Sequence, residues 1–398
     1  MKFDKNKRVF VTGIGVISAI GLNAKENFES LVNKKHGIGK IDLIDTVHKE
    51  ELMVGEIKLT NSELAEKLNI KADHTYPRTT LLAIQAASEA FQDAGIKKDN
   101  SLKTGVIVGT TVGGMDKSEL VYKNIGDDLS FIQSHHCGYT TERVADYLNV
   151  HDFVSSLSTA CSSGVNAILL GARLIKHGLL DRVVVGGTDA LSKFTINGFR
   201  TLMILDTKHS SPFDKTRMGL NLGEGAGMIV LESEKSLNGK KAYCELTGYA
   251  NNNDAFHQTA SSPDGLGPYL SMKNALELSN LDPEDISYIN VHGTGTDNND
   301  LTEGLALIKL FDNKVPMFSS TKAYTGHALG GAGGIESVFS ILAIQHNTVF
   351  PNLNFKEPIP EINLKPVTEP IQNADIKNVM TNSFGFGGND STLIFSKV

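Results

Sequence analysis

The segment FVSSLSTACSSGVNAILLGARLIK, residues 153–176, decides the fold class. It opens with a short apolar run that ends in small residues, which is typical of a buried β-strand. The apolar residues that follow recur at helical spacing: Val165, Ile168, Leu169, Ala172 and Ile175. Further apolar side chains lie between them, so most of the helix surface is apolar. The segment therefore predicts a strand that leads through a tight turn into a buried central helix.

A second segment repeats this pattern in the other half of the chain. The stretch SSTKAYTGH (residues 319–327) leads into a second apolar helix with Ile335, Val338, Phe339 and Leu342. Between the two segments, the polar stretch SEKSLNGKK (residues 233–241) interrupts an otherwise regular alternation of short strands and helices. We therefore predict a duplicated α/β fold, with an N-terminal half at residues 1–236 and a C-terminal half at residues 237–398.

Two local patterns give further expectations. Residues 77–95 predict a helix, because Pro77 precedes an apolar stripe that ends at Gly95. The stretch FPNLNFKEPIPEINLKP (residues 350–366) is rich in proline and predicts an irregular loop crossing the surface.

Composition excludes several classes of protein. The 398 residues carry a formal net charge of -7, so nucleic acid and anionic membrane are not expected as main partners. The three cysteines are widely spaced, which predicts neither a disulfide framework nor a zinc site. The start MKFDKNKRVFVTG lacks the apolar core of a signal peptide, and no apolar run is long enough to span a bilayer. A cytoplasmic protein is expected.

Cys161 is the first candidate for chemistry. It lies at the predicted N-terminus of the buried helix, where free N–H groups and the helix dipole favour a thiolate and stabilise an oxyanion. Small neighbours, Ala160, Ser162, Ser163 and Gly164, would let a substrate approach closely. The alternative is that Cys161 is a packing residue, as most cysteines at apolar positions are.

Two histidines in the C-terminal half follow predicted strands. His292 opens the loop after ISYINV, and His327 precedes the second central helix. A neutral imidazole can donate a hydrogen bond to an enolate that develops beside a thioester. The alternative, structural histidines with satisfied hydrogen bonds, remains open for each.

Glycine-rich segments give weaker signals. NSFGFGGND (residues 382–390) could carry an oxyanion donor, although such a turn is also common in hairpins. VTGIGVISAIG near Gly13 resembles a dinucleotide loop only superficially, because the strand continues through Val16 and Ile17. His135, His136 and Cys137 lack ligand partners at metal-binding spacing, so no metal is expected.

Taken together, TACSSG (residues 159–164), VHGTGT (291–296), STKAYTGHALGGAGG (320–334) and NSFGFGG (382–388) resemble the elongating beta-ketoacyl-acyl carrier protein synthases. PFDKTRMGLNLGEGAGMIVLE (212–232) and DAFHQTASSPDG (254–265) extend the resemblance over almost the whole chain. It implies the thiolase-like fold, with two βαβαβ halves in a five-layered α-β-α-β-α arrangement. It also implies a homodimer, or a heterodimer with a ketosynthase-like chain.

The resemblance also implies roles for individual residues. Cys161 would accept an acyl group from the phosphopantetheine of acyl carrier protein, and His292 and His327 would stabilise the enolate formed from malonyl-acyl carrier protein. Phe386 would supply an oxyanion N–H and gate the malonyl site, while Lys322 and Glu303 would set the electrostatics and orientation of His327. Remaining substrate contacts would come from Thr259, Thr294, Thr296, Phe384 and Gly387. No cofactor of the enzyme's own and no metal are implied.

Residue types separate the near relatives. A biosynthetic thiolase would need a second catalytic cysteine near the C-terminus, which the chain lacks, and the initiating synthases carry Asn in place of His327. A chain-length-factor subunit would lack Cys161. The loop DNND after HGTGT and the ending GGND depart from the usual pattern, so a polyketide or aryl polyene ketosynthase is the alternative to fatty acid elongation. Lys67, Lys71, Lys208 and Arg217 are the candidate basic residues for docking the carrier protein.

Overall fold

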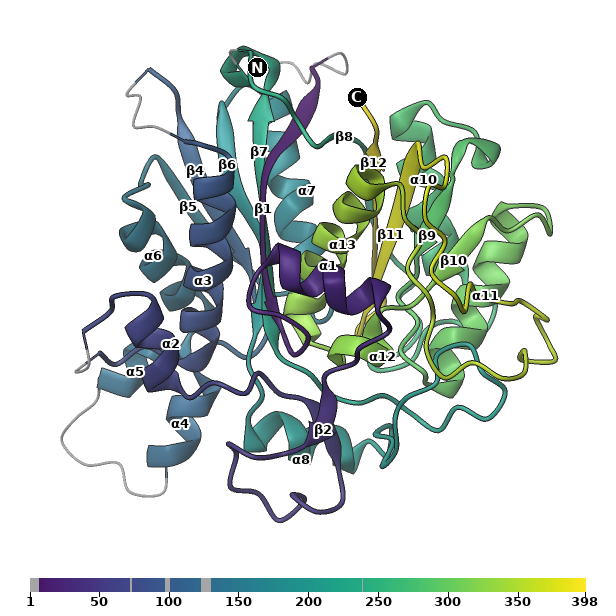
Figure 1. Ribbon diagram of the computed structural model, residues 1–398, viewed down its shortest axis with the longest axis horizontal. Helices are drawn as coiled ribbons and strands as arrows, with labels where there is room; N and C mark the ends of the chain where they lie inside the picture. Colours follow the sequence, from purple (N-terminus) through teal and green to yellow (C-terminus); the bar gives the residue numbers. More distant parts are fainter. Residues whose placement is uncertain (1–6, 72–73, 97–100, 123–129, 238) are drawn as a thin grey trace.

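The computed structural model describes residues 7–71, 74–96, 101–122, 130–237 and 239–398. The expectation that no signal peptide is present rests partly on residues 1–6, which lie outside this set. Ten strands at the centre of the molecule are connected in one hydrogen-bonded order, which divides between β8 and β1 into two halves of five strands, called here the first and the second sheet (Figure 1). The first has the order β5-β4-β6-β7-β1 and consists of β1 (Val9–Ser18), β4 (Thr104–Gly109), β5 (Phe153–Leu157), β6 (Arg182–Asp189) and β7 (Gly225–Ser233).

The second sheet repeats the first strand for strand, in the order β10-β9-β11-β12-β8. Its strands are β8 (Cys244–Asn253), β9 (Tyr288–Asn290), β10 (Met317–Ser319), β11 (Asn378–Gly385) and β12 (Asn389–Ser396). In each sheet the first three strands of this order run parallel to one another. The fourth strand runs antiparallel to the third, and the fifth runs antiparallel to the fourth. A short antiparallel pairing of β1 with β8, at Phe10 and Val11, joins the two sheets. The predicted duplication is confirmed.

Helices form three layers around these sheets. Between the sheets lie α7 (Ser163–Lys176) and α13 (Ala332–His346), which contact strands of both (Figure 1). The first sheet is covered outside by α3 (Arg78–Asp93) and α6 (Cys137–Leu148). The second is covered by α10 (Leu266–Ser279), against which α11 (Asp297–Leu310) packs. The arrangement is the predicted five-layered α-β-α-β-α body.

Shorter elements complete the chain. The helices are α1 (Ala24–Val32), α2 (Asn61–Lys67), α4 (Met115–Val121), α5 (Ser130–His135), α8 (Lys193–Thr201), α9 (Glu234–Leu237) and α12 (Lys322–Thr325). Two 3-10 turns, η1 (Pro283–Asp285) and η2 (Leu329–Gly331), and a small hairpin of β2 (Ile38–Lys40) and β3 (Met53–Gly55) accompany them. None of the helices within the described residues combines the length and apolarity needed to cross a membrane.

Small residues allow the central helices to pack closely. A Cβ on Gly164 of α7 would lie 2.8 Å from the carbonyl oxygen of Gly330, and a Cβ on Gly334 of α13 would lie 2.3 Å from that of Gly227. Because backbone atoms occupy this space, larger side chains would push the layers apart. The helices that carry the two sequence repeats therefore meet at the centre of the molecule.

The predicted helix over residues 77–95 is confirmed as α3, which follows Pro77 and ends before Gly95, a residue with φ of +57°. The proline-rich segment is irregular, as predicted, but it does not simply cross the surface. Ile359 and Ile362 are buried in the apolar core of the C-terminal half. The polar boundary segment contains α9, between the end of β7 and the start of β8.

Candidate active site

Cys161 occupies a tight turn between β5 and α7. Ala160 before it has φ of +53°, a left-handed conformation that is rare for a residue with a side chain. Ser163 fixes the turn, because its Oγ donates to the carbonyl oxygen of Ala160 at 2.6 Å and accepts from the N–H of Thr159 at 2.8 Å. The predicted strand-turn-helix is confirmed, and it holds the Sγ atom where α7 begins.

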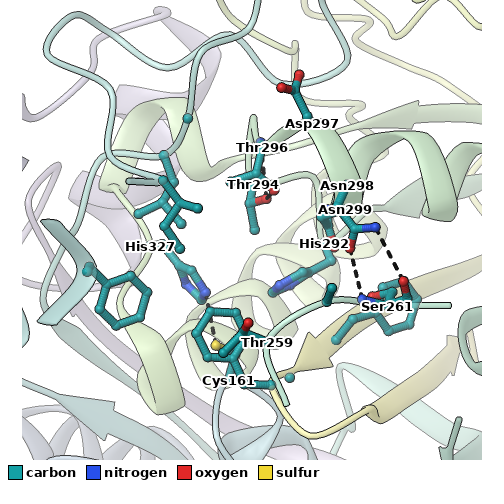
Figure 2. A pocket seen from close by; sticks show the side chains of 18 of the residues that line it. Cys161, Thr259, Ser261, His292, Thr294, Thr296, Asp297, Asn298, Asn299 and His327 are labelled. Carbon is teal, nitrogen blue, oxygen red and sulfur yellow. Dashed lines mark hydrogen bonds between the residues drawn. The ribbon is translucent and has the colours of Figure 1, made fainter. Parts of the chain in front are cut away.

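Both predicted histidines lie beside Cys161. Nε2 of His327 is 3.2 Å from Sγ of Cys161, and the imidazole rings of His292 and His327 have centroids 5.3 Å apart (Figure 2). The backbone of His327 is fixed by the N-terminal half, since its N–H donates to the carbonyl oxygen of Asn221 at 2.8 Å. Residues from both halves of the duplicated fold therefore meet at one point.

Burial controls the charge of these groups. Desolvation, followed by the positive charge of Lys322, lowers the pKa of both His292 and His327 well below the ordinary value, so both imidazoles are neutral. Desolvation raises the pKa of Cys161 to about 12, although Lys322 and the backbone N–H groups of Phe386 and Cys161 act in the opposite direction. Burial therefore opposes the stabilisation of a thiolate that the helix end was expected to give.

Lys322 acts on the electrostatics of His327, as expected, but the hydrogen bonds of Lys322 and Glu303 are made to the other histidine. Nζ of Lys322 donates to the carbonyl oxygen of His292 at 2.5 Å, and Glu303 accepts from the N–H groups of His292 and Gly293 at 2.9 and 2.8 Å. The ion-pair partner of Lys322 is Glu336 on α13, at 2.5 Å. The expected electrostatic effect of Lys322 on His327 is therefore present, whereas the hydrogen bonds that were expected to orient His327 fix the backbone of His292 instead.

The glycine-rich segment forms the turn between β11 and β12, and it packs on the nucleophile turn. Ser383 Oγ donates to the carbonyl oxygen of Cys161 at 2.9 Å, and a Cβ on Gly385 would lie 3.2 Å from the backbone nitrogen of Cys161. The Phe386 ring stacks on that of Phe199 of α8 at a centroid distance of 5.9 Å. The backbone N–H of Phe386 interacts with Sγ of Cys161, as an oxyanion donor requires.

A cavity of about 250 Å³ opens onto Cys161, His292 and His327. Thr259, Thr294, Thr296 and Phe384 line it as well, whereas Gly387 does not; its N–H donates to the carbonyl oxygen of Gln258 at 2.8 Å instead. At the rim, the side-chain amide of Asn298 holds the backbone of Ser261 through two hydrogen bonds of 2.8 and 3.3 Å (Figure 2).

The four basic residues named for carrier docking do not line this cavity. Lys67, Lys71 and Lys208 are exposed, but Arg217 is buried. Its guanidinium donates to the carbonyl oxygens of Asp214, Thr296 and Asp297. Arg217 is therefore a support of the Thr296 loop, and its proposed role in docking was wrong.

Several site residues could not be read from the sequence. Asp189 at the end of β6 is fully buried and accepts from Thr110, Thr111 and the N–H of Gly330, which follows His327. Glu336 and Phe199 lie within helices whose patterns gave no sign of a functional side chain. Asn298 lies in the segment DNND, which the sequence singled out as a departure from the usual pattern. Its two hydrogen bonds to the backbone of Ser261 were not predicted. Within the described residues, no three His, Cys, Asp or Glu side chains form a group that could hold a metal ion.

Comparison with known proteins agrees with this geometry. The family model of the beta-ketoacyl synthase N-terminal domain matches residues 6–236, and that of the C-terminal domain matches residues 243–356. The chain is 35% identical to the 3-oxoacyl-[acyl-carrier-protein] synthase 2 of Staphylococcus aureus (strain COL) and 36% identical to that of Synechocystis sp., in each case over 99% of both chains.

Solved structures give the same result. The ishigamide ketosynthase/chain length factor superposes with a TM-score of 0.93 at 30% identity, over 98% of this chain and 99% of that one. The ketosynthase ApeO in complex with its chain length factor ApeC, from Xenorhabdus doucetiae, superposes with a TM-score of 0.84 at 29% identity over the full length of both chains. By its sequence, its duplicated fold and the domains it matches, this chain belongs to the beta-ketoacyl synthase family.

Proposed function

We propose that the chain catalyses a decarboxylative Claisen condensation, in which an acyl group on Cys161 reacts with malonyl-acyl carrier protein to give 3-oxoacyl-acyl carrier protein in fatty acid elongation. The observation that supports this most is the meeting of one buried thiol and two neutral imidazoles at the end of one cavity. The curated relatives are synthases of this product class by name.

The first half-reaction transfers the acyl group. Sγ of Cys161 attacks the thioester carbonyl, and its proton passes to Nε2 of His327, which lies 3.2 Å away. The C–S bond to the carrier then breaks, and the departing phosphopantetheine sulfur takes that proton. The N–H groups of Cys161 and Phe386 stabilise the tetrahedral oxyanion, each such donor contributing about 3 kcal/mol of barrier lowering.

The second half-reaction forms the carbon–carbon bond. In malonyl-carrier protein the bond to the carboxylate breaks, carbon dioxide leaves, and the electron pair becomes an enolate at the thioester. Nε2–H groups of His292 and His327 donate to the enolate oxygen, for which neutral imidazoles are suited. Nε2 of His327 is unprotonated when it accepts from Cys161, so the neutral ring changes from the Nδ1–H to the Nε2–H tautomer between the two half-reactions. The enolate carbon attacks the acyl carbonyl, the bond to Sγ breaks, and the Cys161 thiolate that leaves takes one proton from solvent water, which is the proton that the overall reaction consumes.

The remaining site residues have supporting roles in this proposal. Thr259, Thr294 and Thr296 hydrogen-bond the phosphopantetheine arm, because they line the approach to Cys161. Phe384 packs beside His292, with ring centroids 5.8 Å apart, and Phe386 gates the malonyl site from its place on Phe199. Gly387 lets the gate segment turn with φ of +78°. Lys322 and Glu303 position His292. The reaction needs no cofactor of the enzyme's own and no metal.

A second candidate is a ketosynthase of polyketide or aryl polyene synthesis. It is favoured by the superposition on the ishigamide ketosynthase/chain length factor and on ApeO, which is described in complex with a chain length factor. A further neighbour is a type II polyketide ketosynthase in complex with its acyl-carrier protein, at 27% identity and a TM-score of 0.88. We propose acyl carrier protein as partner in either case, with a homodimer or a heterodimer as the assembly and the cytoplasm as the location.

The test is product analysis with purified protein, malonyl-acyl carrier protein and a series of acyl-carrier thioesters. Mass spectrometry of the carrier should show a 3-oxoacyl product for wild type and none for Cys161→Ser. A saturated series accepted without a partner subunit supports elongation. Turnover only with a second ketosynthase-like chain supports the alternative. A Cys161→Ser variant that still condenses contradicts both candidates.

A further inference from the structure

Two loops meet beside the cavity of Cys161. The gate loop, residues 385–388, carries Phe386, and the entrance loop, residues 254–262, carries Thr259. Backbone bonds tie them: the N–H of Gly387 donates to the carbonyl oxygen of Gln258 at 2.8 Å, and the N–H of Asp254 donates to that of Gly388 at 3.3 Å. What holds these loops together therefore affects access to the nucleophile.

Asp254 holds the entrance loop through hydrogen bonds to its backbone. Its carboxylate accepts from the N–H groups of Phe256 and Ser262 at 3.1 and 2.9 Å. It also lies directly against the gate loop, because a Cβ on Gly388 would be 2.1 Å from its Oδ1. A charge placed next to Asp254 would therefore act on both loops.

Asp390 places a second carboxyl group there. It pairs across the β11–β12 hairpin with Phe384, is only 1% exposed, and neither of its oxygens has a hydrogen-bond partner among the described residues. It faces Gly267 of α10, where a Cβ would be 2.0 Å from Oδ2 of Asp390 and 3.0 Å from Cβ of Asp254. The side chains of Asp254 and Asp390 therefore lie in the same small space beside Gly267, which a larger residue at that position would fill.

The charged groups that act on Asp390 are both acids: Asp254 of the entrance loop and Glu303 of α11. Burial is the largest cause, and with these two neighbours it raises the pKa of Asp390 to about 8. A buried carboxylate without a hydrogen bond is costly, and two carboxylates in one space repel each other.

We propose that Asp390 is a positioning residue whose proton controls the packing of the entrance loop on the gate loop. When Asp390 is neutral, Asp254 remains against Gly388 and the two loops stay together. When it is ionised, repulsion moves Asp254, and with it Thr259, away from the cavity. The consequence for catalysis rests on the proposed function, since these loops border the cavity in which the thioester would bind.

Hydrogen exchange of the entrance loop tests the proposal without any substrate. Protection would be measured for wild type, Asp390→Asn and the control Glu277→Gln at about pH 7 and about pH 9, which bracket the titration, with correction for intrinsic exchange rates. Glu277 is an exposed acid elsewhere on α10, paired with the exposed Lys273, so its variant removes one carboxylate away from the two loops. Wild type and the control should lose protection by about tenfold at the higher pH, the factor that one pKa unit represents, while Asp390→Asn keeps it.

Equal protection of wild type at both pH values would overturn the proposal, and so would an Asp390→Asn variant that loses protection as wild type does. If Asp390→Asn does not fold, Asp254→Asn removes the other carboxylate and should flatten the same pH dependence. In the condensation assay, KM for the acyl-carrier thioester should rise above pH 8 for wild type but not for Asp390→Asn, with kcat little changed. If no 3-oxoacyl product forms, the proposed function is contradicted but the role of Asp390 is not. The exchange measurement tests that role separately, because it follows protection of the entrance loop without any substrate.

Discussion

Nε2 of His327 lies 3.2 Å from Sγ of Cys161, whereas His292 meets Cys161 only across the cavity, with its ring facing that of His327 at a centroid distance of 5.3 Å. The two histidines are therefore not equivalent. Only His327 is within reach of the thiol proton, but both can donate to an enolate oxygen between them.

This difference predicts different effects of the two alanine variants. His327→Ala should slow both half-reactions, while His292→Ala should slow decarboxylation and leave acylation nearly unchanged. Loss of a proton-transfer group or an enolate donor lowers a rate by about 10²- to 10⁴-fold. Single-turnover acylation and release of carbon dioxide from malonyl-carrier protein measure the two steps separately. Equal loss of both steps in His292→Ala would contradict the assignment.

The buried thiol predicts a pH dependence for alkylation of Cys161. Its pKa is raised to about 12, so the thiolate fraction increases with every unit of pH between about 7 and 10. The rate of alkylation by iodoacetamide, followed by mass spectrometry of the Cys161 peptide, should therefore keep rising over this range. A plateau reached near neutral pH would show that the resting residue is already a thiolate.

The Lys322–Glu336 pair predicts a large loss of stability when one partner is removed. Both side chains are about 2% exposed, so Glu336→Gln leaves a buried ammonium group without its counter-ion. Such a change lowers the free energy of unfolding by about 3–5 kcal/mol, measured by urea denaturation. As control, Glu357→Gln removes an exposed partner of Lys215, and an exposed pair contributes only about 0–1 kcal/mol. Similar losses in both variants would contradict the structural role of the buried pair.

Contact between the central helices can be tested at a glycine. Gly164→Ala would place a Cβ 2.8 Å from the carbonyl oxygen of Gly330 and 2.9 Å from the nitrogen of Gly334, and neither backbone atom can move freely. We expect a loss of about 1–3 kcal/mol in unfolding free energy, as for overpacked cores. Gly198→Ala, in α8, meets nothing within 4 Å and should be neutral or stabilising. A Gly164→Ala protein as stable as wild type would argue against close packing of α7 on the η2–α13 segment.

The sequence predicted what depends on local patterns. Repeated apolar spacing led to the duplicated fold, and strand ends that precede helices led to Cys161, His292 and His327. It did not predict groups that meet only through tertiary packing. Lys322 of α12 and Glu336 of α13 are 14 residues apart and meet only in the folded chain. Glu303 was assigned to the wrong histidine because a shared motif does not tell which backbone N–H groups a carboxylate will accept. The raised pKa of Cys161 depends on burial, which no local pattern reveals.

Intact-mass spectrometry of the protein with an acyl-carrier thioester, and then with malonyl-acyl carrier protein, tests the central claim most directly. We predict that the mass of one acyl group appears on wild type but not on Cys161→Ser, and that it leaves as a 3-oxoacyl-carrier product when the malonyl substrate is added. A chain that never acylates at Cys161, or an acyl group that malonyl-carrier protein does not remove, would contradict the account.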